Sequence, residues 1–385
     1  MTCPGPPNRR HFLGACVGAG LAAHAAPAQR TEAGTAKGPT PLPWPERRKT
    51  IHRAWLDLLG PFPEHVPDLE PTTQRVDDVH GIESRYVTFQ AEPDERVPGY
   101  LLIPDAAKGH PAPAVITVHP TTRGAGKSIA IGLSGRRKED PPLPPPNTRA
   151  YGLELARWGY ITLSIDLMCD GERIPEGLPH YDTRGFYRRH PEWSAVGKNT
   201  WDLMRAVDFL HTLDFVDPAR IACLGHSLGG HSSLFAAAFD ERIAAAVCNG
   251  GVYGWRRNED HWSRPPTENP AAVTSYIYIK KFRPYLEDPS RPVPVDFDGL
   301  MMMVAPRPLL IMQAEFECER DDTVNKVARA AEVYRELEAG DRVSMFNYPG
   351  EHNYPPVAKR FSFSWLDRWF DHTPAVPTIW PGLAI

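Results

Sequence analysis

Six short apolar runs, separated by stretches with helical periodicity, constrain the fold of this 385-residue chain more than any other feature. The runs are AVITVHP, YITLSID, IACLGHS, AAAVCNG, PLLIMQ and VSMFNYP. Each is apolar throughout rather than alternating, which is typical of parallel strands that are buried on both faces. Helical stretches at 148–158, 198–213, 325–338 and 359–371 supply the crossovers that a parallel sheet requires. We therefore expect a doubly wound, mostly parallel α/β sheet.

The segment before these runs predicts a different beginning of the sheet. RYVTFQ (85–90) and VPGYLLIP (97–104) are joined by the polar AEPDER, which favours an antiparallel hairpin. Upstream, the apolar residues of ERRKTIHRAWLDLLG recur at helical spacing and stop at a glycine, which indicates an amphipathic helix. We expect one domain over 46–373, with 46–84 as a helical extension at its start and 374–385 as a tail.

Two longer intervals interrupt the alternation of strands and helices. Residues 121–147 follow the first parallel strand and are rich in proline and charge, and residues 251–300 are rich in aromatic side chains. Insertions at the carboxyl ends of such strands tend to build the substrate site. We expect both intervals to lie over a functional site, and whether 121–147 forms a lid stays open.

The first 28 residues resemble an export signal. NRRHFLGACVGAGLAAHAAPAQ contains the pair Arg9 and Arg10, then a weakly apolar core and small residues that suit cleavage after Ala28. We expect a bacterial twin-arginine signal at 1–28, a proline-rich linker at 29–45, and a periplasmic or extracellular location. No other segment has the roughly 18 consecutive apolar residues of a membrane helix, so we expect no stable membrane insertion after the signal is removed.

Charge and cysteine content narrow the possible partners. The chain has 43 Lys and Arg against 47 Asp and Glu, so it offers no electrostatic reason to bind nucleic acid. Four cysteines lie beyond the signal: Cys169, Cys223, Cys248 and Cys318. Their spacing favours buried free thiols over a metal site, although one disulfide is an alternative in an exported protein. We expect no metal and no organic cofactor.

The stretch IACLGHSLGGHSS (221–233) places Ser227 at the apex of a strand-to-helix turn. A sharp turn of this kind strains the backbone of its apex residue and excludes bulky neighbours, which explains Gly225 and Gly229. The turn lifts Ser227 clear of the sheet at the amino terminus of a helix. Its hydroxyl is therefore a candidate nucleophile.

Two backbone N–H groups are candidate donors to an oxyanion beside this serine. The N–H of Leu228 lies at the start of the predicted helix. The second donor should come from the loop that follows the first parallel strand. Pro120 has no N–H, so Thr121 is the expected donor there.

A serine hydroxyl becomes a good nucleophile only when a base takes its proton. His352 lies in a loop just past the last strand and is the expected base. The acid that orients it should follow the strand RPLLIMQ, because the chain order at such sites is serine, acid, histidine. Several carboxylates stand there in AEFECERDD. The first turn after this strand is the usual place for the acid, which favours Glu317, with Asp321 and Asp322 as alternatives.

The chain from about 85 to 371 resembles the dienelactone hydrolase and acetyl xylan esterase-like branch of the α/β hydrolases, which is related to the prolyl oligopeptidases. The matching segments are VPGYLLIP, PAVITVHPTTRGAGKS, YITLSIDLMCDGER, WDLMRAVDFLHTLDFVDPARIACLGHSLGG, VAPRPLLIMQAE and YPGEHNYPP. The resemblance implies a triad of Ser227, an acid within 315–322 and His352. The acidic turn EFECERDDTV is longer than is usual in that family. Ser227 replaces the cysteine of true dienelactone hydrolases, which implies a serine mechanism.

These features predict a serine carboxylesterase that deacylates esters of carbohydrates, with a small-molecule or polysaccharide ester as its substrate. Trp255 and Trp262 are candidates for stacking on a sugar ring, and ordinary packing is the alternative for both. Two other functions stay open: a prolyl oligopeptidase-like serine peptidase, and a catalytically silent carbohydrate-binding protein on the same fold. The acyl group and the oligomeric state do not follow from the sequence.

Overall fold

The computed structural model describes residues 42–122, 124–133, 149–255, 262, 277–317 and 320–375. Several expectations fall outside these residues: the export signal 1–28, most of the linker, residues 134–147 of the first long interval, Cys318, and residues 376–385 of the tail. All the helices and strands named below belong to one compact unit that begins at Trp44.

Within the described residues, nine strands form one sheet in the order β1-β2-β3-β5-β4-β6-β7-β8-β9. Their bounds are β1 Thr72–Val79, β2 Ile82–Glu92, β3 Glu95–Ile103, β4 Ala112–Val118, β5 Ile161–Ile165, β6 Val216–His226, β7 Ala245–Asn249, β8 Leu309–Ala314 and β9 Val343–Tyr348. The pairs from β1 to β5 are antiparallel, and those from β5 through β4 to β9 are parallel. The predicted doubly wound sheet with an antiparallel hairpin at its start is confirmed.

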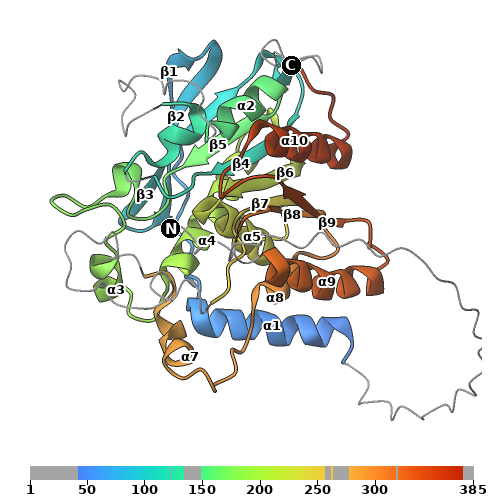
Figure 1. The fold of residues 1–385 in the computed structure, drawn as a ribbon. Helices are drawn as coiled ribbons and strands as arrows, with labels where there is room; N and C mark the ends of the chain where they lie inside the picture. Colours follow the sequence, from blue (N-terminus) through green and yellow to red (C-terminus); the bar gives the residue numbers. More distant parts are fainter. Residues whose placement is uncertain are drawn as a thin grey trace, which may run out of the picture. The chain divides into compact units, whose positions relative to one another are not determined.

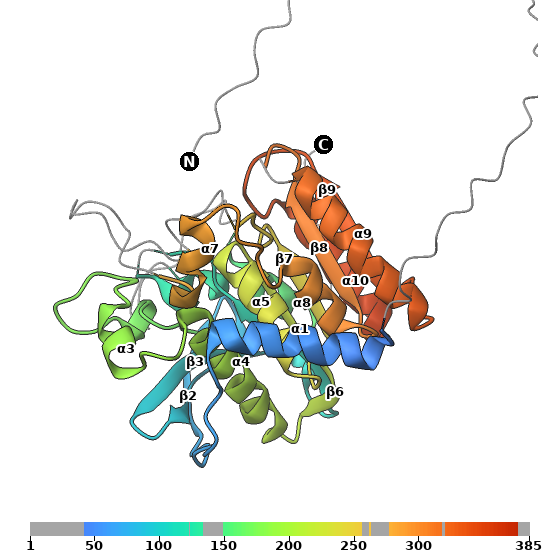
Figure 2. The same cartoon turned by 90° about the horizontal axis from the view of Figure 1, so that it is seen from below.

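Helices cover both faces of this sheet (Figure 1). The α-helices are α1 Trp44–Leu59, α2 Tyr151–Trp158, α3 Arg184–Arg189, α4 Ala195–His211, α5 Leu228–Phe239, α7 Arg283–Glu287, α8 Phe297–Val304, α9 Arg320–Glu336 and α10 Pro356–Phe370. One face carries α2 and α10, and the other carries α4, α5, α8 and α9. Figure 2 shows α1 lying across this second group of helices, where it contacts α4 and α8.

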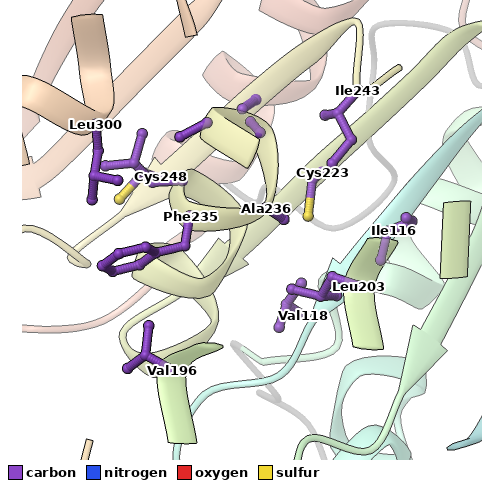
Figure 3. Close-up of a cluster of buried hydrophobic side chains, with 14 of the residues drawn as sticks. Ile116, Val118, Val196, Leu203, Cys223, Phe235, Ala236, Ile243, Cys248 and Leu300 are labelled. Atoms are coloured by element: carbon purple, nitrogen blue, oxygen red, sulfur yellow. The ribbon is translucent and has the colours of Figure 1, made fainter. Parts of the chain in front are cut away.

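The central strands are apolar throughout because both of their faces are buried. Successive side chains of a strand point to opposite faces. In β4, Ile116 and Val118 join the large core under α4 and α5, while Val115 joins the core under α2 and α10. Figure 3 shows Ile116 and Val118 in the large core, in the same cluster as Cys223 and Phe235. This double burial explains the continuous apolar runs in the sequence.

The predicted helical extension over 46–84 is wrong beyond Gly60. Helix α1 ends at Leu59, and Gly60 has a φ of +89°, a conformation that favours glycine. A side chain there would also place its Cβ 2.3 Å from the carbonyl oxygen of Glu192. The chain then forms the edge strand β1, in which only Val76 and Val79 are buried. Because so few of its side chains are buried, β1 is held in the sheet mainly by backbone pairing with β2 and has no sequence pattern that predicts a strand.

Three of the four predicted free thiols lie within the described residues. Cys169, Cys223 and Cys248 are buried and unpaired. Burial raises the pKa of Cys169 and of Cys223 to about 12 each. In the same described ranges, no group of three or more His, Cys, Asp or Glu side chains is arranged to hold a metal ion. No helix there has the length and apolar character needed to cross a membrane.

Candidate active site

Ser227 occupies the strained turn between β6 and α5. Its φ of 59° and ψ of −120° are unusual for a residue with a side chain. Both flanking glycines are required sterically. A Cβ on Gly225 would lie 2.3 Å from the backbone of Gly229, and a Cβ on Gly229 would lie 1.9 Å from the carbonyl oxygen of Val118. The turn therefore needs both glycines that the sequence places beside the serine.

The backbone around Ser227 is fixed by hydrogen bonds from two sides. The N–H of Ser227 donates to the carbonyl oxygen of Asn249 at 2.8 Å, and the N–H of Gly230 donates to the carbonyl oxygen of Ser227 at 2.9 Å. Leu228 is the first residue of α5, so its N–H lies among the helix-start donors that have no partner within a helix. The structure thus places this predicted donor next to the serine hydroxyl.

The loop after β4, residues 119–122 and 124, lies beside this turn and is here called the β4 loop. His119 is fully buried, and its Nε2 accepts the N–H of Leu167 at 3.0 Å. The proton is therefore on Nδ1, which donates to the carbonyl oxygen of Pro120 at 2.8 Å. His119 thus has a structural role, and Thr121, the second predicted donor, is exposed at the surface of the loop.

A buried carboxylate holds the β4 loop in place. Asp170 is fully buried, and its Oδ2 accepts hydrogen bonds from Thr122 Oγ1 and Tyr181 Oη, each at 2.5 Å. Its Oδ1 accepts the N–H of Gly124 at 2.8 Å. The Tyr181 hydroxyl oxygen in turn accepts the N–H of Thr122 at 3.0 Å. Thr122, the neighbour of Thr121, is therefore held through both its backbone and its side chain.

The loops after β8 and β9 bring Glu317 to His352. The Nδ1 of His352 and the Oε1 of Glu317 form a hydrogen bond of 2.5 Å. The Glu317 side chain is 11% exposed and that of His352 is 41% exposed. Gly250 packs against this pair, because a Cβ on it would lie 3.1 Å from Glu317 Oε1 and 3.0 Å from His352 Cε1. A carboxylate on Nδ1 leaves Nε2 of the imidazole available as a base.

The two alternative acids do not reach His352. Asp321 and Asp322 lie in the first turn of α9. Asp321, with 88% of its side chain exposed, pairs with Arg320 at 3.1 Å. Asp322 forms an ion pair with Lys326 one turn further along the helix. Of the three candidates, the structure brings only Glu317 into contact with the histidine.

A neutral network supports the loop that carries His352, residues 349–355, here called the β9 loop. The ring of His226 lies against that of His352 with a centroid distance of 4.6 Å. Asn249 Nδ2 donates to His226 Nδ1 at 3.0 Å and to the carbonyl oxygen of Asn353 at 3.2 Å. The Tyr348 hydroxyl lies within hydrogen-bond distance of two acceptors, Asn249 Oδ1 at 2.8 Å and the carbonyl oxygen of Asn353 at 2.5 Å. Burial holds the pKa of His226 well below 6.5, so this ring is neutral.

The predicted sugar-stacking role of Trp255 and Trp262 is wrong for both residues. Their exposed fractions are 5% and 0%. The two indoles pack edge to face at 4.5 Å, and Trp255 stacks on Phe297 of α8 at 5.0 Å. Trp55 of α1 lies 5.7 Å from Trp255. These tryptophans fill the space between α1 and α8, so packing, the alternative interpretation, is correct.

Sequence reasoning missed Asp170 and Tyr253. Asp170 belongs to the segment YITLSIDLMCDGER, but its contact with Thr122 joins residues 48 positions apart. Tyr253 follows β7, and its hydroxyl oxygen lies 3.3 Å from Ser227 Oγ. For Asp170, its position as a carboxylate shortly after a strand of a parallel sheet is a usable signal. For Tyr253, a tyrosine in an aromatic-rich interval, the sequence offers no such signal.

Comparisons with known proteins show which families and chains this sequence resembles. The model of the family "Glucuronyl esterase, fungi" matches residues 181–338. YtaP of Bacillus subtilis (strain 168), whose name classes it as a hydrolase, is 25% identical over 334 residues, which are 84% of this chain and 99% of YtaP. Carbohydrate esterase MZ0003 of an unknown prokaryotic organism is 30% identical over 156 residues, which are 39% of this chain and 35% of that protein.

Solved structures share the fold. A glucuronoyl esterase from Solibacter usitatus has a TM-score of 0.63 at 19% identity and aligns with 84% of this chain and 92% of its own. A candidate acetyl xylan esterase of Bacteroides fragilis NCTC 9343 has a TM-score of 0.60 at 19% identity, covering 79% of this chain and 75% of its own. Fold, serine turn and family match agree: the chain belongs to the α/β hydrolase superfamily and is a hydrolase of ester bonds.

Proposed function

We propose that this protein is a serine esterase that acts on carboxylic esters of carbohydrates, with Ser227 as nucleophile, His352 as general base and Glu317 as the acid that orients it. One observation carries the proposal: the hydrogen bond between His352 Nδ1 and Glu317 Oε1, on loops beside the strained turn of Ser227. The similarity to glucuronoyl and other carbohydrate esterases supports the choice of substrate class.

In this mechanism Ser227 Oγ attacks the ester carbonyl carbon while its proton moves to His352 Nε2. The negative charge that develops on the carbonyl oxygen is stabilised by the N–H groups of Leu228 and Thr121. The bond to the alcohol then breaks, and the alcohol oxygen takes the proton from His352. A water molecule then attacks the acyl carbon while His352 takes a proton from the water. The bond between the acyl carbon and Ser227 Oγ breaks, Oγ takes the proton from His352, and the carboxylic acid leaves.

Steady-state hydrolysis of p-nitrophenyl acetate tests these roles. In Ser227→Ala and His352→Ala the value of kcat should fall about 10⁴-fold or more, and in Glu317→Ala by about 10³-fold to 10⁴-fold. Asp322→Ala is the matched control, because that carboxylate pairs with Lys326 on α9. Equal activity of folded wild type and Ser227→Ala would refute the proposed mechanism.

The acyl group needs a separate comparison. An acetyl ester places the sugar on the alcohol side of the ester, whereas a glucuronoyl ester places it on the acid side. We propose acetyl groups on polysaccharides as the substrate. Initial rates on acetylated xylo-oligosaccharides and on the methyl ester of glucuronic acid distinguish the two classes. A higher kcat/KM for the glucuronate ester would show that the acyl group is a sugar acid and not acetyl.

We also propose that the protein is exported through its twin arginine, Arg9 and Arg10. An extracytoplasmic location fits polymeric carbohydrate substrates, which cannot enter the cell. Cell fractionation of the full chain and of a variant with both arginines changed to lysine tests this. Equal distribution of the two proteins between cytoplasm and periplasm would contradict the proposal.

A further inference from the structure

The phenol of Tyr253 reaches the oxygen atom that the proposed function makes the nucleophile. The Tyr253 hydroxyl oxygen lies 3.3 Å from Ser227 Oγ. Tyr253 belongs to the loop after β7, on the side of β6 from which Glu317 and His352 also come. Its ring centroid is 6.3 Å from that of His352. The strand β4, which the β4 loop follows, lies on the opposite side of β6.

Either oxygen can donate in this contact, and the proposed mechanism requires Tyr253 to be the donor in the active state. The proton of Ser227 must point at His352 for transfer, which leaves Oγ only as an acceptor. Burial raises the pKa of the Tyr253 phenol well above 10, although the hydrogen bond to Ser227 opposes the shift, so the phenol keeps its proton near neutral pH. A protonated phenol beside an acceptor oxygen donates to it.

The strength of this bond differs between the two halves of the reaction. In the free enzyme Oγ is a hydroxyl oxygen and already accepts from Tyr253, so the bond exists before acylation begins. In the acyl-enzyme Oγ is the alkoxy oxygen of an ester, which is a weaker acceptor. Only interactions that are stronger in the transition state than in the ground state accelerate a step. The hydrogen bond therefore gains most strength during deacylation.

We propose that Tyr253 is a catalytic residue of deacylation, a role that rests on the proposed function of Ser227. Water attacks the acyl carbon while His352 Nε2 accepts a proton from that water molecule. The bond between the acyl carbon and Oγ then breaks, its electron pair stays on Oγ, and Oγ takes the proton from His352. Tyr253 keeps its own proton throughout and donates a hydrogen bond to Oγ while negative charge develops there.

Rapid-mixing kinetics of Tyr253→Phe with p-nitrophenyl acetate test this role, because phenylalanine retains the ring and removes only the hydroxyl. Release of the first nitrophenol reports acylation, and the later steady rate reports deacylation when a burst is present. We expect kcat to fall about tenfold, the effect of one lost hydrogen bond, and KM to fall in proportion. The value of kcat/KM should stay close to that of the wild type, with a burst of one nitrophenol per site.

Two controls complete the experiment. Tyr334→Phe removes another buried phenol hydroxyl, which donates to the carbonyl oxygen of Arg307 at 2.9 Å, and should leave both kcat and kcat/KM unchanged. Hydroxylamine, a nucleophile that attacks acyl-enzymes, should raise kcat of Tyr253→Phe toward the wild-type value. The melting temperature of each variant verifies its fold.

Two results would overturn the role of Tyr253. Equal decreases in kcat and kcat/KM would assign it to acylation or to the general shape of the site, and unchanged values of both would leave the phenol without a catalytic role. Failure of the proposed function is recognised separately, by wild-type activity no higher than that of Ser227→Ala, and the role of Tyr253 would then be rejected with it.

Discussion

The two loops that flank Ser227 are held by different chemistry. A buried carboxylate, Asp170, is the main support of the β4 loop and accepts hydrogen bonds from Thr122 Oγ1, Tyr181 Oη and the N–H of Gly124. His119 of the same loop adds a neutral contact with the N–H of Leu167. The β9 loop is held by neutral amide and phenol groups, through the contacts of Asn249 with Tyr348 Oη and with the carbonyl oxygen of Asn353. The contact between His352 and Glu317 is the one ionisable pair described for that loop.

This difference has a physical reason. A donor to an oxyanion acts only if it is in place before charge develops, so the β4 loop benefits from the stronger hydrogen bonds that a charged acceptor makes. A general base is instead positioned by its own carboxylate partner, and its loop needs only moderate support. Removing the carboxylate that supports the β4 loop should therefore reduce activity more than removing one of the neutral hydrogen bonds that support the β9 loop.

Among variants that remove the support of one of these two loops, the largest effect is expected for Asp170→Asn. The amide retains one acceptor oxygen but turns an NH₂ group toward donors, so at least one hydrogen bond to the β4 loop is lost. We expect kcat/KM for p-nitrophenyl acetate to fall about 100-fold, a value near that for removal of one oxyanion donor. The melting temperature should fall as well.

Asp367→Asn provides the matched control for this prediction. Asp367 accepts hydrogen bonds from Trp158 Nε1 at 2.8 Å and Tyr160 Oη at 2.9 Å, in α10 on one face of the sheet. Its loss should lower the melting temperature and leave kcat/KM unchanged. If both variants lost activity in proportion to stability, the special role of Asp170 would be refuted.

A smaller effect is expected for Tyr348→Phe. The variant removes the hydroxyl that shares its one proton between Asn249 Oδ1 and the carbonyl oxygen of Asn353 in the β9 loop. One neutral hydrogen bond contributes about 1 kcal/mol, so we expect kcat/KM to fall about fivefold in the same assay. A loss greater than that of Asp170→Asn would reverse the comparison between the two loops.

The smallest effect is expected for His226→Gln and concerns stability. Burial, followed by the charges of His352 and Arg149, holds the pKa of His226 well below 6.5 in the folded protein. Below about pH 6.5 the unfolded chain binds a proton there that the folded protein does not, so stability falls as the pH is lowered. Glutamine can still accept from Asn249 but does not titrate. The decrease in melting temperature between about pH 7 and pH 5 should therefore be smaller in the variant.

His52→Gln separates this effect from that of other histidines. The pKa of His52 is also lowered, by partial burial and then by Arg48, but His52 lies in α1, away from the β9 loop. Its replacement should reduce the pH dependence only slightly and leave the contribution of His226 in place. An unchanged slope in His226→Gln would show that His226 is not the group responsible.

The sequence predicted the elements that are recognisable from their own residue types. Continuous apolar runs identified β4 to β9, and Gly225 and Gly229 identified the turn at Ser227 because no larger residue fits there. Strand β1 escaped prediction because TTQRVDDV has only two buried residues and pairs through its backbone.

The site was predictable for residues that follow strands in the expected chain order, and not for residues whose role depends on a single side-chain contact. Ser227, Glu317 and His352 follow strands in sequence, so their proximity could be expected. Asp170 and Tyr253 gain their importance from contacts with residues 48 and 26 positions away, which periodicity does not indicate. The tryptophans were misassigned because an aromatic residue suits a core and a sugar equally well, and only burial distinguishes the two.

The buried thiols have a consequence for the environments in which the protein can fold. Thiol oxidation proceeds through the thiolate, and burial raises the pKa of Cys169 and Cys223 to about 12 each, so both are almost entirely protonated near neutral pH. The part of the fold that contains them neither requires an oxidant to form nor offers one a reactive sulfur. Its stability should therefore be the same in a reducing cytoplasm and in an oxidising space outside it.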